Sequence, residues 1–216
     1  MELETSGSFA EIATLKFSSI SYGLERFKDA YRGYASLLAI AEIEANRKAA
    51  RLGMMRSAYR EKDYVSSISA AGVVRNSGDI DAAEKREADY ILGKSYMASS
   101  KRDQALAVFR ELSASPNTPE GAEARYILLQ DAFDRGNFDS VEKMVYEFSK
   151  DAGDQYYWLA KSYLVLGDSF VEKGKMDEAK ACYESILDGY SPEEGRADDI
   201  ADTVRAKLER LVKLNG

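Results

Sequence analysis

Carboxylates form the clusters of side chains in this chain whose types and spacing could support chemistry. Asp79 and Asp81 flank a single isoleucine, and Asp198, Asp199 and Asp202 form a second group. Paired carboxylates can act as general acid and base, or they can bind Mg²⁺ or Ca²⁺. Both groups also stand where helices are expected to begin, and acidic residues interact favourably with that end of a helix. We therefore predict that these carboxylates cap helices, and we assign them neither a metal nor a cofactor.

Nucleophilic and transition-metal chemistry is disfavoured because the chain contains no histidine and only one cysteine, Cys182. Zinc sites use about three or four Cys, His or carboxylate ligands, and catalytic serines and cysteines usually need a histidine base. The sequence also contains neither a Walker-type glycine loop nor a dinucleotide-binding fingerprint. Cys182 lies beside Tyr183 in a predicted helix, so we interpret it as a buried, unreactive thiol. The sequence therefore predicts a protein that is not an enzyme.

Charge is unevenly distributed along the chain. The net charge is −7, with +2 over residues 1–78 and −9 over residues 79–216. An acidic majority argues against binding to nucleic acid, which relies on Lys and Arg beside phosphates. It favours a basic or neutral partner at the C-terminal end, or it merely keeps the helix surfaces soluble.

The sequence carries little information about the compartment. No apolar stretch approaches the ~18–20 residues that span a bilayer, so direct membrane insertion is not expected. Residues 1–4 are acidic in character and lack the apolar core of a signal peptide. The localisation is therefore unknown. It is cytoplasmic for the chain as written, and periplasmic or associated with the outer membrane if a leader precedes this sequence in the natural protein.

Helices are the elements expected to position these side chains. Only three prolines and fifteen glycines interrupt the 216 residues, and such sparse punctuation favours helix. Two segments share one pattern in which a glycine lies twelve residues before an alanine. They are Leu92-Gly93-x-x-Tyr96 with Ala105-x-x-x-Phe109, and Leu166-Gly167-x-x-Phe170 with Ala179-x-x-x-Tyr183. The small residues would allow two helices to approach closely, and the aromatic residues would fill space beside that contact.

The same twelve-residue interval predicts three further helix pairs, with anchors at Ser18–Ala30, Gly53–Val65 and Leu129–Val141. The small residues that we expect to anchor the packing are Ala30, Gly53, Gly93, Ala105, Gly167 and Ala179. We therefore predict five helical hairpins, over about residues 8–44, 45–76, 79–115, 118–150 and 154–189. The connection from Val65 to Gly93 is the longest, so the array is expected to depart from regularity there.

These motifs resemble the tetratricopeptide repeat, a helix–turn–helix unit of about 34 residues. The resemblance covers nearly the whole chain, and the extra length of its units resembles bacterial members of the cell envelope. It implies an all-α fold, a right-handed superhelical α-solenoid of about five hairpins over residues 8–190. The family's function implies a non-enzymatic scaffold or adaptor that binds a protein or peptide.

A final helix is predicted over residues 191–214. Ile200, Val204, Leu208 and Leu211 recur there at helical spacing with charged residues between them. Such a helix could cap the repeat array, because the end of an array needs a polar outer face. Alternatively, it could pair with another copy of the chain or with a neighbouring domain.

The resemblance also implies which residues would contact a partner, because the first helices of the repeats line a concave groove in this family. The groove candidates are Arg47, Ala50, Met54, Tyr90, Lys94, Met97, Tyr126, Gln130, Phe133, Leu164 and Asp168. Aromatic residues and methionine are common at adaptable binding surfaces, although these side chains could instead pack against neighbouring hairpins. Arg47 and Arg51 could assist a clamp for a C-terminal carboxylate, but the lysine and asparagine of such a clamp are absent. The alternative function is a structural subunit of a larger, envelope-associated assembly, built through the terminal helix or the convex face.

Overall fold

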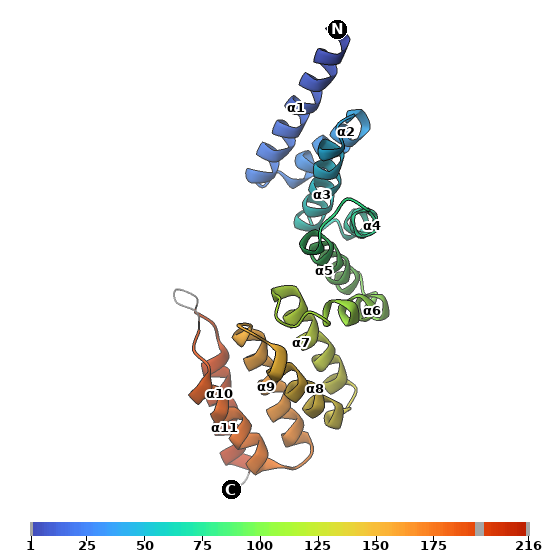
Figure 1. Cartoon of the computed structure of the whole chain (residues 1–216). Helices are drawn as coiled ribbons and strands as arrows, with labels where there is room; N and C mark the ends of the chain where they lie inside the picture. Colours follow the sequence, from blue (N-terminus) through green and yellow to red (C-terminus); the bar gives the residue numbers. More distant parts are fainter. Residues whose placement is uncertain (1, 193–196, 215–216) are drawn as a thin grey trace. The chain divides into compact units, whose positions relative to one another are not determined.

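The chain is helical throughout the part that can be described. The structure is a computed structural model that describes residues 2–192 and 197–214, with side chains for residues 9–192 and 197–213. No strand occurs within these ranges (Figure 1), which confirms the expected all-α fold. The helices are α1 (Glu2–Gly23), α2 (Phe27–Ile40), α3 (Glu44–Arg60), α4 (Tyr64–Arg75), α5 (Ala82–Ala98), α6 (Arg102–Leu112), α7 (Pro119–Asp134), α8 (Phe138–Asp151), α9 (Tyr156–Glu172), α10 (Met176–Gly189) and α11 (Ile200–Leu214).

Three-residue turns join the helices into the pairs α1–α2, α3–α4, α5–α6, α7–α8 and α9–α10. The middle residue of each turn lies in the left-handed region, which is common where a helix ends and the chain reverses. These residues are Glu25 (φ 57°), Lys62 (φ 62°), Ser100 (φ 59°), Gly136 (φ 74°) and Gly174 (φ 71°). They follow one another at intervals of 37, 38, 36 and 38 residues, so the repeat length is nearly constant.

The turns correct the predicted register of the second hairpin. Counted from Lys62, its anchors are Met55 and Ser67, which are both fully buried, whereas Val65 is 81% exposed. Gly53 is buried for another reason: a Cβ there would lie 2.5 Å from the ring of Tyr34 in α2. The anchor pair Gly53–Val65 is therefore wrong by two residues, because a glycine that serves a different helix contact matched the motif.

The corrected anchor makes the array regular. The anchors on the second helices become Ala30, Ser67, Ala105, Val141 and Ala179, with spacings of 37, 38, 36 and 38 residues. The long connection expected between Val65 and Gly93 is an artefact of the misplaced anchor. From Ser67 to Gly93 the chain runs 26 residues, close to the other connections.

Two compact units divide the chain, Met1–Val108 and Phe109–Gly216, with the boundary inside α6. In the first unit, Tyr34 and Leu37 of α2 form a buried cluster with Ala50 of α3. In the second unit, a larger cluster joins residues of α7, α8, α9, α10 and α11, including Leu166 and Tyr183. Each unit therefore has a hydrophobic core of its own.

Helix α11 packs against α10 and α9 within the second unit. Ile200, Val204 and Leu211 are buried in the shared core, while Arg205 and Glu209 are exposed on the outer face. The helix begins at Ile200, later than the expected start near residue 191; residues 193–196 lie outside the described part. Asp198 accepts a hydrogen bond from the backbone N–H of Ile200 at 3.0 Å, which supplies a cap at the observed start.

Candidate functional site

The two carboxylate clusters have structural partners. Asp81 caps α5, accepting bonds from the backbone N–H groups of Ala83 and Glu84, and the Glu84 carboxylate accepts in return from the Asp81 N–H. Asp79 accepts from Arg51 at 2.6 Å. In the second cluster, Asp202 pairs with Arg205 at 2.8 Å, and Asp198 caps α11. Among the described residues, no group of three or more metal-ligating side chains is close enough to hold an ion.

The single thiol is not a nucleophile at neutral pH. Cys182 is buried on α10, and its thiol donates to the backbone carbonyl of Tyr163, with 3.4 Å between sulfur and oxygen. Burial, assisted by the charge of Asp168, raises the pKa of Cys182 to about 12. The thiol is therefore protonated, as expected from its position in a helix.

The register shift changes the predicted groove residues of the second hairpin. The positions that correspond to Tyr90, Lys94 and Met97 of α5 are Leu52, Arg56 and Tyr59 of α3. Arg47, Ala50 and Met54, which were predicted as groove residues of the second hairpin, do not occupy these equivalent positions. Arg47 donates to the carbonyl of Ala41 at 2.8 Å, Ala50 is fully buried, and Met54 packs against the core cluster of the first unit.

In the first unit, ion pairs join α3 to residues just before and within the beginning of α5. Both are the first helices of their hairpins. Arg56 donates two hydrogen bonds to Glu87, at 2.7 and 2.6 Å, and this pairing raises the pKa of Arg56. Lys48 pairs with Glu84 at 2.6 Å, which raises the pKa of Lys48 and lowers that of Glu84. Arg51 is likewise held by Asp79.

These ion pairs disfavour a clamp for a partner's carboxylate at Arg47 and Arg51. Arg51 is engaged by Asp79 at 2.6 Å and by Glu44 at 3.1 Å, and Arg47 contacts Glu44 at 3.2 Å. A partner's carboxylate would have to displace these acidic groups. On α5, Lys94 lies 5.7 Å from the ring centroid of Tyr90, and Met97 is exposed one turn further on.

An aromatic cluster lies between α7 and α9 in the second unit. The ring of Tyr126 lies 5.4 Å from that of Trp158, and Tyr157 meets Trp158 edge-on at 5.0 Å. The ammonium of Lys161 lies 4.8 Å from the centroid of Tyr126 and 5.5 Å from those of Tyr157 and Trp158. We call these four residues the aromatic cluster. Only Tyr126 was among the predicted groove residues.

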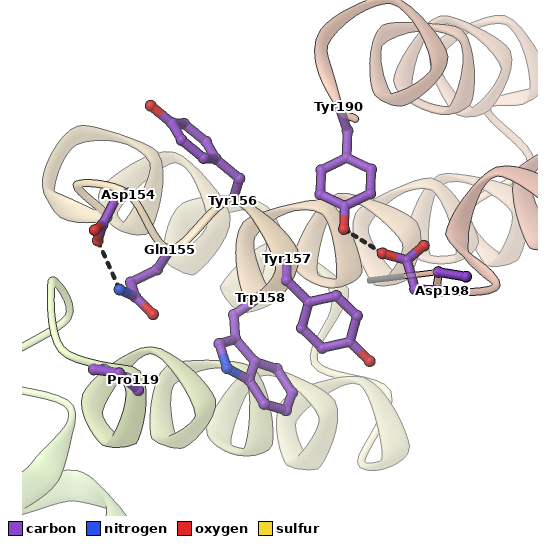
Figure 2. Close-up of a pocket in the computed structure, with 9 residues that line it drawn as sticks. Pro119, Asp154, Gln155, Tyr156, Tyr157, Trp158, Tyr190 and Asp198 are labelled. Carbon is purple, nitrogen blue, oxygen red and sulfur yellow. Dashed lines mark hydrogen bonds between the residues drawn. The ribbon is translucent and has the colours of Figure 1, made fainter. Parts of the chain in front are cut away.

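A pocket of about 600 Å³ opens beside the aromatic cluster. Tyr156 and Tyr157 at the start of α9 line it, and both are exposed. On the other side, the Tyr190 hydroxyl donates to the carboxylate of Asp198 (Figure 2). We call this the aromatic pocket; the full lining is Pro119, Asp154, Gln155, Tyr156, Tyr157, Trp158, Tyr190, Ala197 and Asp198.

Figure 2 also shows how three consecutive aromatic residues diverge from the start of α9. Trp158 projects toward α7, where its ring meets Tyr126. Tyr156 projects away from Trp158, and Tyr157 belongs to the aromatic cluster and also lines the pocket. The run Tyr156-Tyr157-Trp158 was a visible sequence signal, but its partners Tyr190 and Asp198 are more than thirty residues away in the chain.

The other groove candidates of the second unit have internal partners. Gln130 donates to Asp134 at 2.9 Å, and the ring of Phe133 lies 5.6 Å from that of Phe138. Leu164 is buried in the core. Asp168 accepts from the Tyr183 hydroxyl at 2.6 Å and from Lys207 of α11 at 2.6 and 2.8 Å. Leu164 and Asp168 therefore stabilise the unit, and Phe133 is only partly accessible.

Comparisons with known families agree with the helical hairpins and their spacing. Two family profiles, both described as tetratricopeptide repeat, match residues 90–140 and 156–191. The chain therefore contains tetratricopeptide repeats in these segments, and repeats of this family generally serve as non-catalytic modules for protein–protein interaction. A search of curated proteins found no significant match. Within the described residues, no helix combines the length and apolar character needed to cross a membrane.

Proposed function

We propose that the second unit is an adaptor surface that binds a segment of a partner protein across the aromatic pocket and the aromatic cluster. The observation that carries the proposal is the exposure of Tyr156 and Tyr157 at the mouth of a pocket. Tyrosine and tryptophan in concave, partly desolvated places are the residues that most often dominate protein-binding energy. Their rings also lose little conformational entropy when a partner covers them.

The charge of the second unit favours a basic segment. Residues 109–216 contain 14 basic and 22 acidic side chains, a net charge of −8. Asp154 and Asp198 lie at the pocket itself, next to aromatic rings that attract cations through their faces. A segment that combines apolar or aromatic side chains with Lys or Arg fits this chemistry, and its association should weaken as salt rises.

The test is a selection of peptides from a displayed random library against the full chain. Selected peptides should be basic, and their affinity should fall at least about tenfold on Tyr157→Ala, the cost of losing a hot spot. Tyr146→Ala is the matched control, because Tyr146 is an exposed tyrosine on α8 outside both features. Peptides that bind the Tyr157→Ala and native chains equally well would refute the proposal.

The alternative, an assembly subunit that self-associates through its last helix, has weaker support. Leu211 and Val204 of α11 are buried against the chain's own core, and Leu208 packs there in part. The exposed outer face of α11 is mostly polar, with Val212 as the exposed large apolar side chain among residues 200–213. We therefore infer that α11 mainly covers the hairpin α9–α10, which precedes it.

A further inference from the structure

Helix α1 displays an apolar stripe on its surface. Phe9 is 73% exposed, Phe17 56%, Ile20 61% and Leu24 60%. With Ala13, these residues recur at intervals of four, four, three and four, which places Phe9, Ala13, Phe17 and Ile20 on one face of the helix, with Leu24 directly after its last residue. We call Phe9, Ala13, Phe17, Ile20 and Leu24 the α1 stripe. Contiguous exposed apolar surface of this kind marks an interaction site.

The centre of the stripe corresponds to positions that are covered in later repeats. Ala13, Phe17 and Ile20 precede Glu25, the middle residue of the turn that follows α1. In three later first helices, the residues at the same distances before the turn are a small residue, a large residue and a serine. These triplets are Ala50-Met54-Ser57, Ala88-Leu92-Ser95 and Ser162-Leu166-Ser169. All of these residues are buried except Met54, which is partly buried.

The second helix of the preceding hairpin covers those positions. Ala50 and Met54 of α3 pack in a cluster with Tyr34 of α2. Ser95 of α5 shares a hydrogen bond of 2.8 Å with Ser67 of α4. Helix α11 continues the pattern, because Ile200 and Val204 are buried where α11 packs on α10.

We propose that the α1 stripe is the docking face for one more helical hairpin of the tetratricopeptide type, which this sequence does not contain. The second helix of that hairpin packs along α1 as α2 packs along α3. The stripe thereby becomes an internal contact of a longer stack, and the hairpin supplies a small residue opposite Ile20, where three later repeats have serine. The stripe belongs to the first unit, so its role is independent of the aromatic pocket.

The second helices α2, α4, α8 and α10 of another copy of the chain are poor sources for this contact. The stripe needs a second helix whose forward face is open. The face of α10 that looks toward the following helix is covered by α11, whose Ile200 and Val204 are buried. The forward faces of α2, α4 and α8 are occupied by α3, α5 and α9. Space for an incoming side chain exists beside the stripe, in an open groove of about 460 Å³ lined by Ala13, Phe17 and Gly33.

The experiment compares the chain with a fusion that adds an idealised tetratricopeptide hairpin. The hairpin is joined ahead of residue 7, the position equivalent to the first residue of α3, by a connection as short as Ala41–Ile43. The variant is Phe17→Ser with Ile20→Ser. In the chain alone this variant should leave the melting temperature nearly unchanged, because both side chains are exposed.

In the fusion, docking should raise the melting temperature of the first unit by several degrees, and the double variant should abolish that rise. Val212→Ser is the matched control: it replaces an exposed apolar residue on α11, and it should preserve the rise. The proposal is overturned if the double variant keeps the full rise. It is also overturned if sedimentation shows that the chain alone forms a stable dimer that the double variant dissociates, because the occupant would then be a second copy.

Discussion

Gly167 of α9 lies directly against the aromatic ring of Tyr183 in α10. A Cβ at Gly167 would be 2.2 Å from Cε1 of that ring, so only glycine permits this approach. The ring is buried, and its hydroxyl donates to Asp168 at 2.6 Å. Hydrogen bonding to this carboxylate adds to burial in raising the pKa of Tyr183. The contact therefore fixes both the spacing of the two helices and the position of a polar group.

The second hairpin places the large and the small residue of this pair of positions the other way round. At the position of Gly167 the second hairpin has Met55, and at the position of Tyr183 it has Ala71; both are fully buried. A large side chain on the first helix thus accompanies a small one on the second. The close packing of protein interiors explains why the two positions must change together.

Replacing Gly167 with alanine tests the contact. The added methyl group overlaps the Tyr183 ring, so we expect Gly167→Ala to lower the free energy of unfolding by about 1–3 kcal/mol. Gly189→Ala in α10 is the control, because no atom of a neighbouring residue lies within 4 Å of the place its methyl group would take. It should be neutral or slightly stabilising, since alanine favours helix. Urea denaturation of both variants measures the difference, and equal effects would contradict the close approach.

The register of the second hairpin can be tested by two substitutions two residues apart. Val65→Asp should change the melting temperature little, because Val65 is exposed at the start of α4. Ser67→Leu should cost about 1–3 kcal/mol, because Ser67 is fully buried and bonded to Ser95. Thermal unfolding followed by circular dichroism distinguishes the two. A large loss for Val65→Asp would restore Gly53–Val65 as the anchor pair.

Cys182 should be protected from alkylation in the folded protein. Its pKa of about 12 leaves almost no thiolate at pH 8, so iodoacetamide should react slowly until urea unfolds the chain. The folded pKa lies above the ordinary thiol value of 9.0, so this group's contribution to stability is complete below pH 9. That contribution is lost as pH rises from 9 toward 12. Cys182→Ala should lose less stability over that interval, and rapid alkylation of native protein at pH 8 would contradict the burial.

The buried carboxylate of Asp89 provides a further prediction. Arg75 Nε lies 2.8 Å from one oxygen of Asp89, and the more exposed Lys85 lies 2.7 Å from the other. Arg75→Ala should cost about 3 kcal/mol, because it leaves a buried charge without its main partner. Lys85→Ala, which removes an exposed partner of the same carboxylate, should cost under about 1 kcal/mol. Chemical denaturation gives both values, and an equal cost would show that burial does not govern this site.

Much of the fold could be predicted, because sparse glycine and proline and a repeated small-residue motif both favour helical hairpins. The error in the second hairpin arose because Gly53 satisfies a contact with Tyr34 that single-hairpin reasoning ignores. The late start of α11 was missed because Ser191-Pro192 resembles a helix start, whereas Asp198 caps the observed one.

The candidate site was predictable only in part. Tyr126 follows from its place on a first helix, but the aromatic pocket depends on Tyr190 and Asp198, which lie outside the repeat helices and far along the chain. Asp168 has internal partners that the sequence did not indicate. Its position in the repeat indicates a groove residue, yet Tyr183 and Lys207 bind its carboxylate. Partners that lie on other elements decide such cases, and a one-dimensional spacing does not reveal them.

The left-handed turn residues divide this backbone into interchangeable blocks. Deleting the chain from just after Glu25 through Lys62 would remove 37 residues and rejoin two equivalent points. Helix α1 would then lead into α4 through a turn of unchanged length. Recombination at such points can lengthen or shorten a protein in whole steps, while an insertion of one or two residues elsewhere would disturb every contact in its hairpin. Unequal exchange between such points would therefore change the number of hairpins while every turn keeps its length.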